Sequence, residues 1–448
     1  MNLFDLTDAD RQRAAEHIAF AEREAATIDD LPAGVTPRPV NSVAIIGAGT
    51  MGGGIALSLA AANIPSTLIE TGDEALQRGL ARVRKTLEAS VKRGSLDADQ
   101  MQARLALIGG SLSLEDAAAD VDLIIEAVFE DMALKKQIFT RLDGIARAGT
   151  VLATNTSGLD IDEIAAVTGR PAEVIGAHFF SPANVMRLLE VVRTRDSAPD
   201  VIATLMALGP RIGKTAVLAR VYPGFVGNAM FRQYHREAHF LVEDGALPHE
   251  VDAALTAFGY RMGIFAVHDL AGNDVGYSVR KAQMATRDND RRWNDLIIEL
   301  VDMGRLGQKS GRGWYRYDDG DRRPQRDPDL ETIIIERSAR MGITRRPIDA
   351  DEILQRCLFG MVNEGARLLE RGIAQRPSDI DIVFLRGYGF PPEQGGPMFM
   401  ADRIGLGRVA ATVRRLHDAH GAWWEPAPLL LQLAAEERSF ADWQRNRR

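Results

Sequence analysis

The sequence has a single cysteine, Cys357, among its 448 residues, so no intramolecular disulfide can form. This usage is typical of a reducing compartment, and the apolar helical setting EILQRCLFGMV favours a buried structural thiol over a nucleophile. No stretch approaches the roughly 18 uninterrupted apolar residues of a membrane span, and the N-terminus lacks the basic and apolar regions of a signal peptide. We therefore expect a cytoplasmic protein without a membrane span.

Positive charge is also in short supply, because 54 Lys and Arg face 62 Asp and Glu, for a net charge of −8. Nucleic-acid binders usually carry a basic face, so nucleic acid is not an expected partner. An anionic substrate stays open, since a local basic patch would serve it. A hydrophobic content of 46% and this length indicate a globular chain of two to four domains.

The pattern along the chain changes twice. Residues 7–28 are expected to form a helix capped by Thr7 or Asp8, followed by a linker rich in Pro and Gly. From residue 42, helical stretches alternate with the apolar runs VAIIG, PSTLIE, VDLIIEAV, TVLATNTS and EVIGAHFF. This alternation predicts a parallel α/β sheet. After residue 222 the strand signal fades and helices dominate.

The helical part contains a repeated order of motifs. The first copy carries Glu237-Ala238, Glu243-Asp244-Gly245, Glu250-Val251-Asp252 and Gly259-Tyr260; the second carries Glu364-Gly365-Ala366, Glu370-Arg371-Gly372, Asp379-Ile380-Asp381 and Gly387-Tyr388. Chance similarity between two amphipathic helices is the alternative. We favour duplication of a helical domain.

The segment Gly47-Ala48-Gly49-Thr50-Met51-Gly52 matches G-x-G-x-x-G, follows an apolar strand and opens a helix. Gly47 permits the tight turn, Gly49 lets the backbone approach a pyrophosphate, and Gly52 allows close packing of helix and strand. The helix N-terminus, including Thr50 and Met51, attracts the pyrophosphate. Glu70 ends the next strand, where it would bind ribose hydroxyls and repel a 2′-phosphate. NAD is thus favoured over NADP, and FAD remains a rival.

These features predict a Rossmann-type, mostly parallel α/β domain followed by two tandem all-α domains. The expected boundaries are 1–38 for an N-terminal helix and linker, 39–221 for the NAD-binding domain, and 222–325 and 326–448 for the helical domains.

His178 is the best candidate for a catalytic base. It follows the apolar run EVIGA and so belongs at the carboxyl end of a strand, where open α/β sheets bind ligands. Glu190 lies in the apolar run MRLLEVV and needs a partner, because an unpaired buried charge is costly. Pairing the two would orient the imidazole and raise its basicity. A satisfied core histidine is the alternative reading of His178.

Two further polar residues could supply hydrogen bonds to a substrate. Ser157, in Asn155-Thr156-Ser157, follows another apolar strand and shares the same sheet edge. Asn228 begins the helical region in GFVGN, where it could equally be a helix N-cap.

The other histidines suggest no metal site. His235 and His239 lie in HREAH, which is not H-E-x-x-H and has no evident third ligand. We expect them on a solvated helix face, and His268 is ambiguous. The remaining four are expected at the surface: His17, His249, His417 and His420.

Six segments together resemble L-3-hydroxyacyl-CoA dehydrogenases across residues 41–445: GAGTMGGGIA, EAVFEDMALKKQIF, NTSGLDIDEIA, GAHFFSPANVMRLLEVV, GFVGN and GRLGQKSGRGWY. GYRMGIFAVHDLAGNDVG and the tandem helical domains look like the dehydrogenase half of peroxisomal-type multifunctional β-oxidation enzymes. The resemblance implies NAD-dependent oxidation of a (3S)-3-hydroxyacyl-CoA to 3-oxoacyl-CoA.

The resemblance also implies residue roles. His178 is the catalytic base and Glu190 its partner. Ser157 and Asn228 contact the hydroxyl and thioester region of the substrate, and Ser157 also lies against the cofactor. Lys309 lies near the cofactor, and Glu126 lines its nicotinamide side.

This chain departs from the multifunctional pattern in one large respect. Those enzymes carry an upstream enoyl-CoA hydratase domain, whereas only residues 1–41 precede the first strand here. We expect no hydratase activity. The segment AFAEREA resembles the linker helix after that domain, so the N-terminal helix is expected to dock on the C-terminal helical domains. Ala229 replaces the usual Arg of GFVGNR, which bears on domain docking or substrate choice.

Several questions stay open. An acyl-CoA thioester is the expected partner, and a basic stretch could meet its phosphates or simply form a solvated helix face: Arg78, Arg82, Arg84, Lys85, Lys92 and Arg93. The chain is expected to be a monomer or a homodimer. The rival functions are a dehydrogenase of a non-CoA hydroxy acid and a catalytically inactive NAD-binding protein.

Overall fold

The computed structural model describes residues 3–446 except 278–279, 282–283, 285–286, 289–290 and 319. Its contacts divide the chain into two compact units. The sheet unit comprises residues 17–229 and 371–388, and the helical unit comprises residues 1–16, 230–370 and 389–448. These units do not follow the expected boundaries at 38, 221 and 325, because part of the second helical copy packs on the sheet. The boundaries themselves stay predictions.

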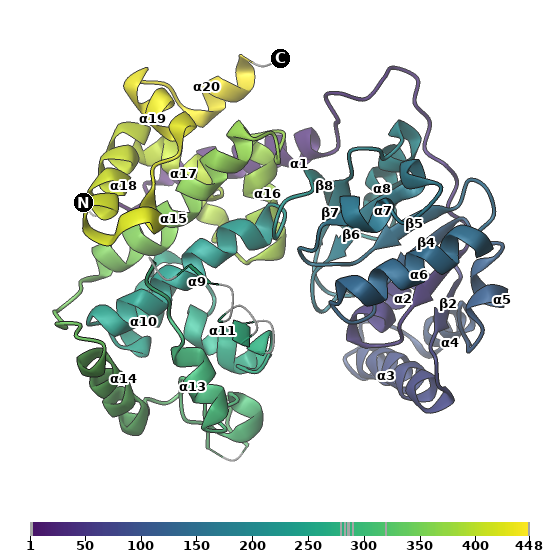
Figure 1. Ribbon diagram of the computed structural model, residues 1–448, viewed down its shortest axis with the longest axis horizontal. Coiled ribbons are helices and arrows are strands. Elements are labelled where there is room, and N and C mark those ends of the chain that lie inside the picture. Colours follow the sequence, from purple (N-terminus) through teal and green to yellow (C-terminus); the bar gives the residue numbers. More distant parts are fainter. Residues whose placement is uncertain are drawn as a thin grey trace. The chain divides into compact units, whose positions relative to one another are not determined.

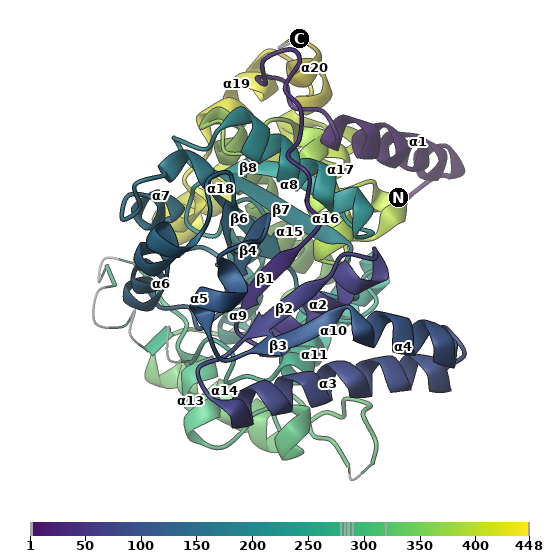
Figure 2. The same ribbon diagram turned by 90° about the vertical axis from the view of Figure 1, so that its right-hand side faces the viewer.

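Within the described residues, eight strands form one sheet in the order β3-β2-β1-β4-β5-β6-β7-β8 (Figures 1 and 2). Neighbouring strands are parallel except β6 and β7, which are antiparallel. The predicted mostly parallel sheet is therefore confirmed. The bounds are β1 Val43–Ile46, β2 Ser66–Ile69, β3 Ile108–Ser111, β4 Leu123–Glu126, β5 Val151–Thr154, β6 Val174–Phe179, β7 Leu188–Arg193 and β8 Thr215–Arg220.

Helices flank both faces of this sheet. Alternate strand side chains such as Val43, Ile45 and Ile125 join a buried core with α2, α3 and α8, and α5, α6 and α7 cover the opposite face (Figure 2). The bounds are α2 Thr50–Ala61, α3 Asp73–Lys92, α4 Ala98–Ala106, α5 Leu114–Ala118, α6 Met132–Ile145, α7 Ile161–Ala165, α8 Pro199–Arg211 and α16 Pro377–Gly387, with a 3-10 turn at Pro171–Glu173.

The N-terminal helix α1 (Asp8–Ala25) docks on the second helical copy, as expected from its resemblance to a linker helix. Within the sheet unit, His17 Nε2 lies 2.8 Å from Asp381 Oδ2 on α16. Arg376, at the N-cap of α16, donates to the carbonyl oxygen of Glu24 at 2.6 Å. These bonds fix the C-terminal half of α1 against α16.

The helical unit is built from α9 onward. Its helices are α9 Gly227–Asp244, whose first residues lie in the sheet unit, α10 Pro248–Phe258, α11 Ile264–Ala271, α13 Leu296–Asp302, α14 Pro328–Arg340, α15 Ala350–Glu370, α17 Pro397–Ile404, α18 Leu406–His420, α19 Pro428–Ala435 and α20 Phe440–Arg445; 3-10 turns lie at Gln308–Ser310, Pro392–Gln394 and Gly421–Trp424. Among the described residues, no helix is long and apolar enough to cross a membrane. Cys357 on α15 is buried, as expected, and burial raises the pKa of its thiol.

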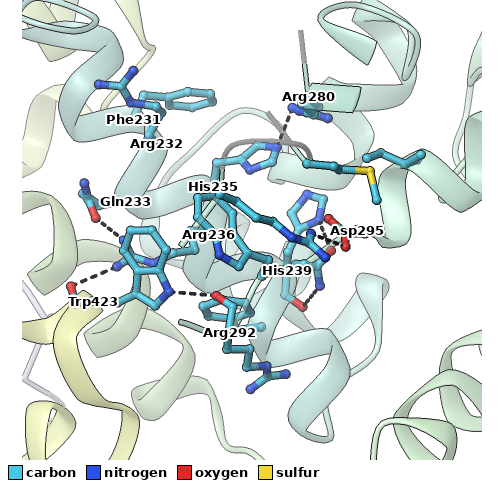
Figure 3. A pocket seen from close by; sticks show the side chains of 16 residues that line it. Phe231, Arg232, Gln233, His235, Arg236, His239, Arg280, Arg292, Asp295 and Trp423 are labelled. Carbon is cyan, nitrogen blue, oxygen red and sulfur yellow. Dashed lines mark hydrogen bonds and ion pairs between the residues drawn. The ribbon is translucent and has the colours of Figure 1, made fainter. Parts of the chain in front are cut away.

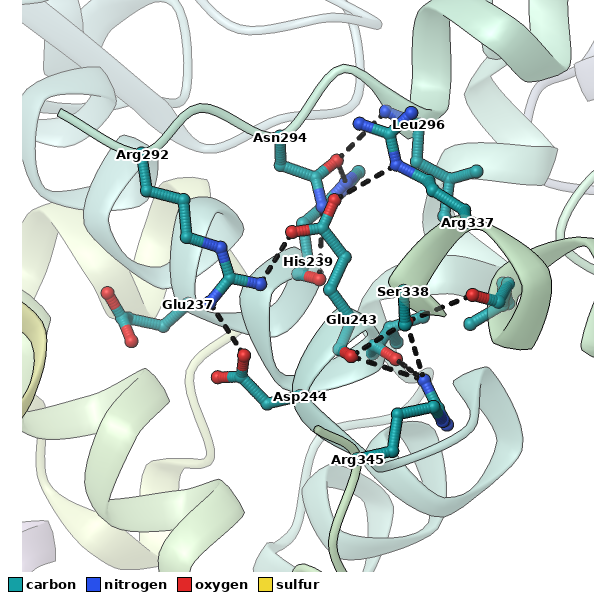
Figure 4. A network of polar contacts seen from close by, with 12 residues as sticks. Glu237, His239, Glu243, Asp244, Arg292, Asn294, Leu296, Arg337, Ser338 and Arg345 are labelled. Atoms are coloured by element: carbon teal, nitrogen blue, oxygen red, sulfur yellow. Dashed lines mark hydrogen bonds and ion pairs between the residues drawn. The ribbon is translucent and has the colours of Figure 1, made fainter. Parts of the chain in front are cut away.

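A network of buried charges explains how the polar sequence of α9 enters a core (Figure 4). Glu243 is fully buried, and its carboxylate accepts from Arg292 at 2.6 Å and from Arg337 at 3.1 Å. The expectation of a solvated helix face is therefore wrong for His239, whereas His235 is partly buried. His239 is only 1% exposed, because ion pairs inside the unit neutralise the charges that made this helix look like a surface.

Candidate active site

The glycine-rich turn between β1 and α2 has the shape of a pyrophosphate cradle. Gly47 has a φ of +104°, and a Cβ there would lie 2.7 Å from the carbonyl oxygen of Ala127. A Cβ at Gly52 would lie 1.9 Å from the carbonyl oxygen of Gly47, so neither position accepts a side chain. At Gly49, by contrast, no atom of the described residues other than Gly49 and its two chain neighbours lies within 4 Å of such a Cβ, which leaves open space for a ligand.

Helix α2 begins at this cradle, and the backbone N–H groups of its first turn are available to bind a ligand. Gly49 is the N-cap of α2, Thr50 and Met51 lie in the first turn, and no side chain of the described residues caps the helix. The free N–H groups and the positive end of the helix dipole suit an anion. The residues present therefore fit the pyrophosphate of a dinucleotide.

Glu70 lies directly after β2 and beside the cradle. Its Oε1 accepts a hydrogen bond from the N–H of Ala48 at 2.7 Å. The carboxylate thus supports the glycine turn at the place where the adenosine ribose of a bound dinucleotide is expected.

His178 and Glu190 face each other across the antiparallel strands β6 and β7, where they are paired in register. His178 Nδ1 lies 2.7 Å from Glu190 Oε2, with His178 5% exposed and Glu190 fully buried. The other carboxylate oxygen accepts from the N–H groups of Val226 at 3.2 Å and Gly227 at 2.9 Å. The charge of Glu190 is therefore compensated, and the imidazole is held in one orientation.

Aromatic rings and a side-chain amide fix the surroundings of His178. The ring of Phe180 lies 4.3 Å from the imidazole between centroids, and that of Phe225 lies 5.7 Å away. Asn155 Oδ1 accepts from the N–H of Phe179 at 2.8 Å, which ties the end of β5 to the end of β6. The imidazole therefore sits in a largely apolar setting at the carboxyl end of its strand.

Ser157 and Asn228 are brought together beside this edge. Asn228 Nδ2 donates to the carbonyl oxygen of Ser157 at 3.1 Å, and Tyr388 Oη donates to Asn228 Oδ1 at 2.7 Å. Glu130 Oε1 accepts from the hydroxyl of Ser157 at 2.9 Å and from its N–H at 2.7 Å. Because α9 begins at Gly227, Asn228 lies inside its first turn and is not the N-cap.

The sequence interpretation missed both Glu130 and Tyr388. Glu130 follows β4 just as Ser157 follows β5, so its position at the carboxyl edge was a usable signal. Tyr388 is the C-cap of α16, 160 positions from Asn228 along the chain, and no local pattern links the two.

Glu126 lies inside the sheet, and its expected place on the nicotinamide side of the cofactor stays a prediction. Its carboxylate is fully buried in β4, where it accepts from Lys135 Nζ at 2.7 and 2.9 Å and from Thr154 Oγ1 at 2.6 Å. The bonds to Lys135 hold α6 to the sheet.

Lys309 belongs to the helical unit, where its ammonium group is half exposed and pairs with Asp274 at 2.5 Å. Its contact with the cofactor stays a prediction.

A dinucleotide cradle and an imidazole oriented by a buried carboxylate share one parallel sheet, which places the chain among nicotinamide-dependent oxidoreductases. The family comparison narrows this class. Residues 42–221 match the NAD-binding domain of 3-hydroxyacyl-CoA dehydrogenase, and residues 224–317 and 353–441 match its C-terminal domain. The chain belongs to the 3-hydroxyacyl-CoA dehydrogenase family. Two matches to the C-terminal domain support the predicted duplication.

Two relatives show how far the similarity extends. The chain is 45% identical to the peroxisomal bifunctional enzyme of Danio rerio over 96% of its own length, and 39% identical to that of Homo sapiens over 98%. It spans only 62% and 63%, respectively, of the lengths of those proteins.

Solved structures share the fold. The 3-hydroxybutyryl-CoA dehydrogenase of Escherichia coli covers 89% of this chain with a TM-score of 0.76 and 27% identity, and 99% of that protein is matched. The dehydrogenase part of multifunctional enzyme 1 from C. elegans covers 93% with a TM-score of 0.67 and 30% identity, and 96% of it is matched.

Proposed function

We propose that the chain oxidises a (3S)-3-hydroxyacyl-CoA to the 3-oxoacyl-CoA, with NAD⁺ as the hydride acceptor. The observation that carries this proposal is the buried pair of His178 and Glu190, 2.7 Å apart at the carboxyl end of the sheet. A hydroxyl group gives up its proton most readily to a base that is oriented and whose charged form is stabilised.

The geometry of the pair sets the direction of proton transfer. Because Nδ1 of His178 is engaged with Glu190, Nε2 is the ring atom left to take the hydroxyl proton. The electron pair of the C3–H bond leaves as hydride for C4 of the nicotinamide, and C3 becomes a carbonyl carbon. The buried carboxylate of Glu190 stabilises the imidazolium that forms. The same groups serve the reverse reduction.

Ser157 and Asn228 complete the site in this proposal by hydrogen-bonding the hydroxyl and thioester region of the substrate. Glu130 and Tyr388 position them through the bonds described above. The CoA moiety is proposed from the family, whose models cover most of the chain. The exposed basic side chains on α3, from Arg78 to Lys92, remain either its phosphate site or a solvated helix face.

Several partners and properties also stay proposals. The named relatives are peroxisomal enzymes of two activities, and for this chain we propose only the dehydrogenase step of β-oxidation. A cytoplasmic location and a monomeric or homodimeric state stay predictions.

The test is NADH formation from 3-hydroxyacyl-CoA thioesters of four carbons upward, aromatic ones included. His178→Ala should lower kcat by a factor on the order of 10³, while NADH binding followed by fluorescence stays within twofold of wild type. His417→Ala, in α18 of the helical unit, is the matched control and should keep full activity.

Two results would reject the proposal. Wild type that binds NADH but oxidises no thioester would favour an inactive NAD-binding protein. Faster turnover of a free hydroxy acid than of its CoA thioester would favour the rival dehydrogenase.

A further inference from the structure

Three histidines converge inside the helical unit. His235 and His239 lie one turn apart on α9, with ring centroids 4.2 Å apart (Figure 3), and His268 comes from α11. The ring of His268 lies 4.6 Å from that of His235 and 5.5 Å from that of His239. One nitrogen from each ring lies within 4.8 Å of the others. A third histidine beside His235 and His239, which the sequence did not reveal, is therefore present.

Two of the buried ring nitrogens in this cluster lack hydrogen bonds to the part of the chain that the structure describes. His239 Nε2 and His268 Nδ1 are both buried and have no hydrogen-bond partner among the described residues. Buried polar atoms in proteins are nearly always bonded, so two orphaned nitrogens in one cluster call for a partner. The deeply buried His239 carries one of them.

The orphaned nitrogen of His239 is also the one that carries a lone pair. Its Nδ1 lies 3.2 Å from Asn294 Oδ1, and since that oxygen only accepts, Nδ1 holds the proton. The tautomer is thereby fixed with Nε2 unprotonated. Outer hydrogen bonds of this kind are what orient histidine ligands in metal sites.

Burial favours the uncharged form of the three rings. Desolvation lowers the pKa of His268 to about 3 and holds the pKa values of His235 and His239 well below their usual range. Neutral imidazole is the form that coordinates metals, so no proton has to be released at neutral pH.

The second helical copy shows that α9 does not need these side chains to pack. When Glu237 is placed opposite Glu364 and Glu243 opposite Glu370, His235 corresponds to Val362 and His239 to Ala366. Both are fully buried apolar residues of α15. The imidazoles of the first copy are therefore additions to a helix that folds around aliphatic side chains.

We propose that His235, His239 and His268 bind one divalent transition-metal ion, with Zn²⁺ as the representative. Zinc–nitrogen bonds of about 2.0–2.1 Å place tetrahedral ligand atoms roughly 3.3 Å apart. Small rotations of rings that are already within 4.8 Å reach this spacing. Imidazole ligands select Zn²⁺, Cu²⁺, Ni²⁺ and Co²⁺ over Mg²⁺ and Ca²⁺.

A solvent molecule fills the fourth position. His235 and His239 line a cavity of about 440 Å³ on the helical unit, together with Arg280, Asn294 and Trp423 (Figure 3). Three protein ligands and an open position are the pattern of accessible zinc sites. Because the ligands come from α9 and α11, the ion also cross-links these two helices.

Arg280 should weaken metal binding, so its replacement tests the proposed site in the direction opposite to that of the ligand variants. Its guanidinium donates to Nε2 of His235 at 3.1 Å, so it occupies a lone pair that the metal needs and adds a like charge. Since Arg280 lines the same cavity, its side chain has room to withdraw. Removing it should tighten metal binding, whereas a variant that loses a ligand should weaken it.

The experiment is calorimetric titration of the full-length, chelator-treated protein with Zn²⁺, repeated with Co²⁺ under an absorption spectrometer. One ion should bind per chain. His239→Ala, which installs the residue of the second copy, and His268→Gln should each weaken binding at least tenfold. Arg280→Met should tighten it at least threefold, and His417→Asn serves as the control that changes nothing.

Zinc should also raise the melting temperature of wild type but not of the ligand variants, because an ion that binds only the folded chain stabilises it. Absence of saturable zinc binding at 0.1 mM, or binding that survives both His239→Ala and His268→Gln, overturns the proposal. If a ligand variant fails to fold, the zinc affinity of Arg280→Met tests the proposal. An affinity equal to or weaker than that of wild type would reject the site.

Discussion

The two helical copies use equivalent residues for different work. In the first, Asp252 on α10 accepts from the N–H groups of Phe265 and Ala266 at 3.0 Å each and so caps α11. In the second, the equivalent Asp381 on α16 pairs with His17 of α1 at 2.8 Å. One copy uses its aspartate to build its own interior, whereas the other uses it to hold a segment from the start of the chain.

The tyrosines that close the two copies differ in the same way. Tyr260 packs among the rings of Tyr234, Phe258 and Phe390 in the helical unit. Tyr388 instead donates to Asn228 in the candidate active site. The two copies thus share a scaffold, whereas equivalent residues have separate roles, one structural and one beside the candidate active site.

The largest expected difference between the copies concerns a buried charge. Glu243→Ala removes the carboxylate that pairs with Arg292 and Arg337, and leaves two guanidinium groups short of a partner. We expect a loss of about 3–5 kcal/mol in the free energy of unfolding. The equivalent Glu370 is exposed, so Glu370→Ala should change stability by less than about 0.5 kcal/mol. Urea unfolding of both variants measures the contrast, and equal effects would contradict it.

A second effect should appear in the pH dependence of stability. Burial raises the pKa of Asp379 on α16 to about 7, against a partial opposing effect of Arg376. The folded state therefore holds a proton that the unfolded chain has already lost between about pH 4 and 7. This contribution to stability is complete below about pH 4 and is lost as the pH rises through 7; a shift of about three pKa units corresponds to about 4 kcal/mol.

Asp379→Asn should flatten the unfolding free energy across this window relative to wild type. The matching position in the first copy is Glu250, whose side chain is exposed, and Glu250→Gln is the control. A wild-type slope retained in Asp379→Asn would show that another group titrates there.

The smallest effect distinguishes the two tyrosines. Tyr388→Phe removes the hydrogen bond to Asn228, and since such a bond contributes about 1 kcal/mol, kcat/KM should fall roughly three- to tenfold. Tyr260→Phe should leave kcat/KM unchanged. Steady-state assays with a hydroxyacyl-CoA compare the two, and a larger loss in Tyr260→Phe would reverse the assignment.

Local sequence signals were sufficient for most of the sheet. Five apolar runs located β1, β2, β4, β5 and β6. The cost of an unpaired carboxylate in an apolar run indicated a partner for Glu190, and His178 lies 2.7 Å from it. β3 gave no usable signal because its sequence is IGGS and two of its residues are exposed glycines. The contacts of Tyr388 and His268 could not be read because each joins segments that are far apart along the chain. The burial of His239 depends on ion pairs between distant residues, and the spacing of apolar residues along the sequence does not reveal such pairs.

The register of β6 and β7 has a consequence for protein engineering. His178 and Glu190 face each other only because the antiparallel ladder aligns them, and successive residues of a strand point to opposite faces. One residue inserted within either strand would turn one partner of the pair away from the other, although both side chains would still be present. The connection between the strands, residues 180–187, lies outside the ladder. Grafting or lengthening experiments there can vary the sequence beside the site while the proton-transfer pair stays aligned.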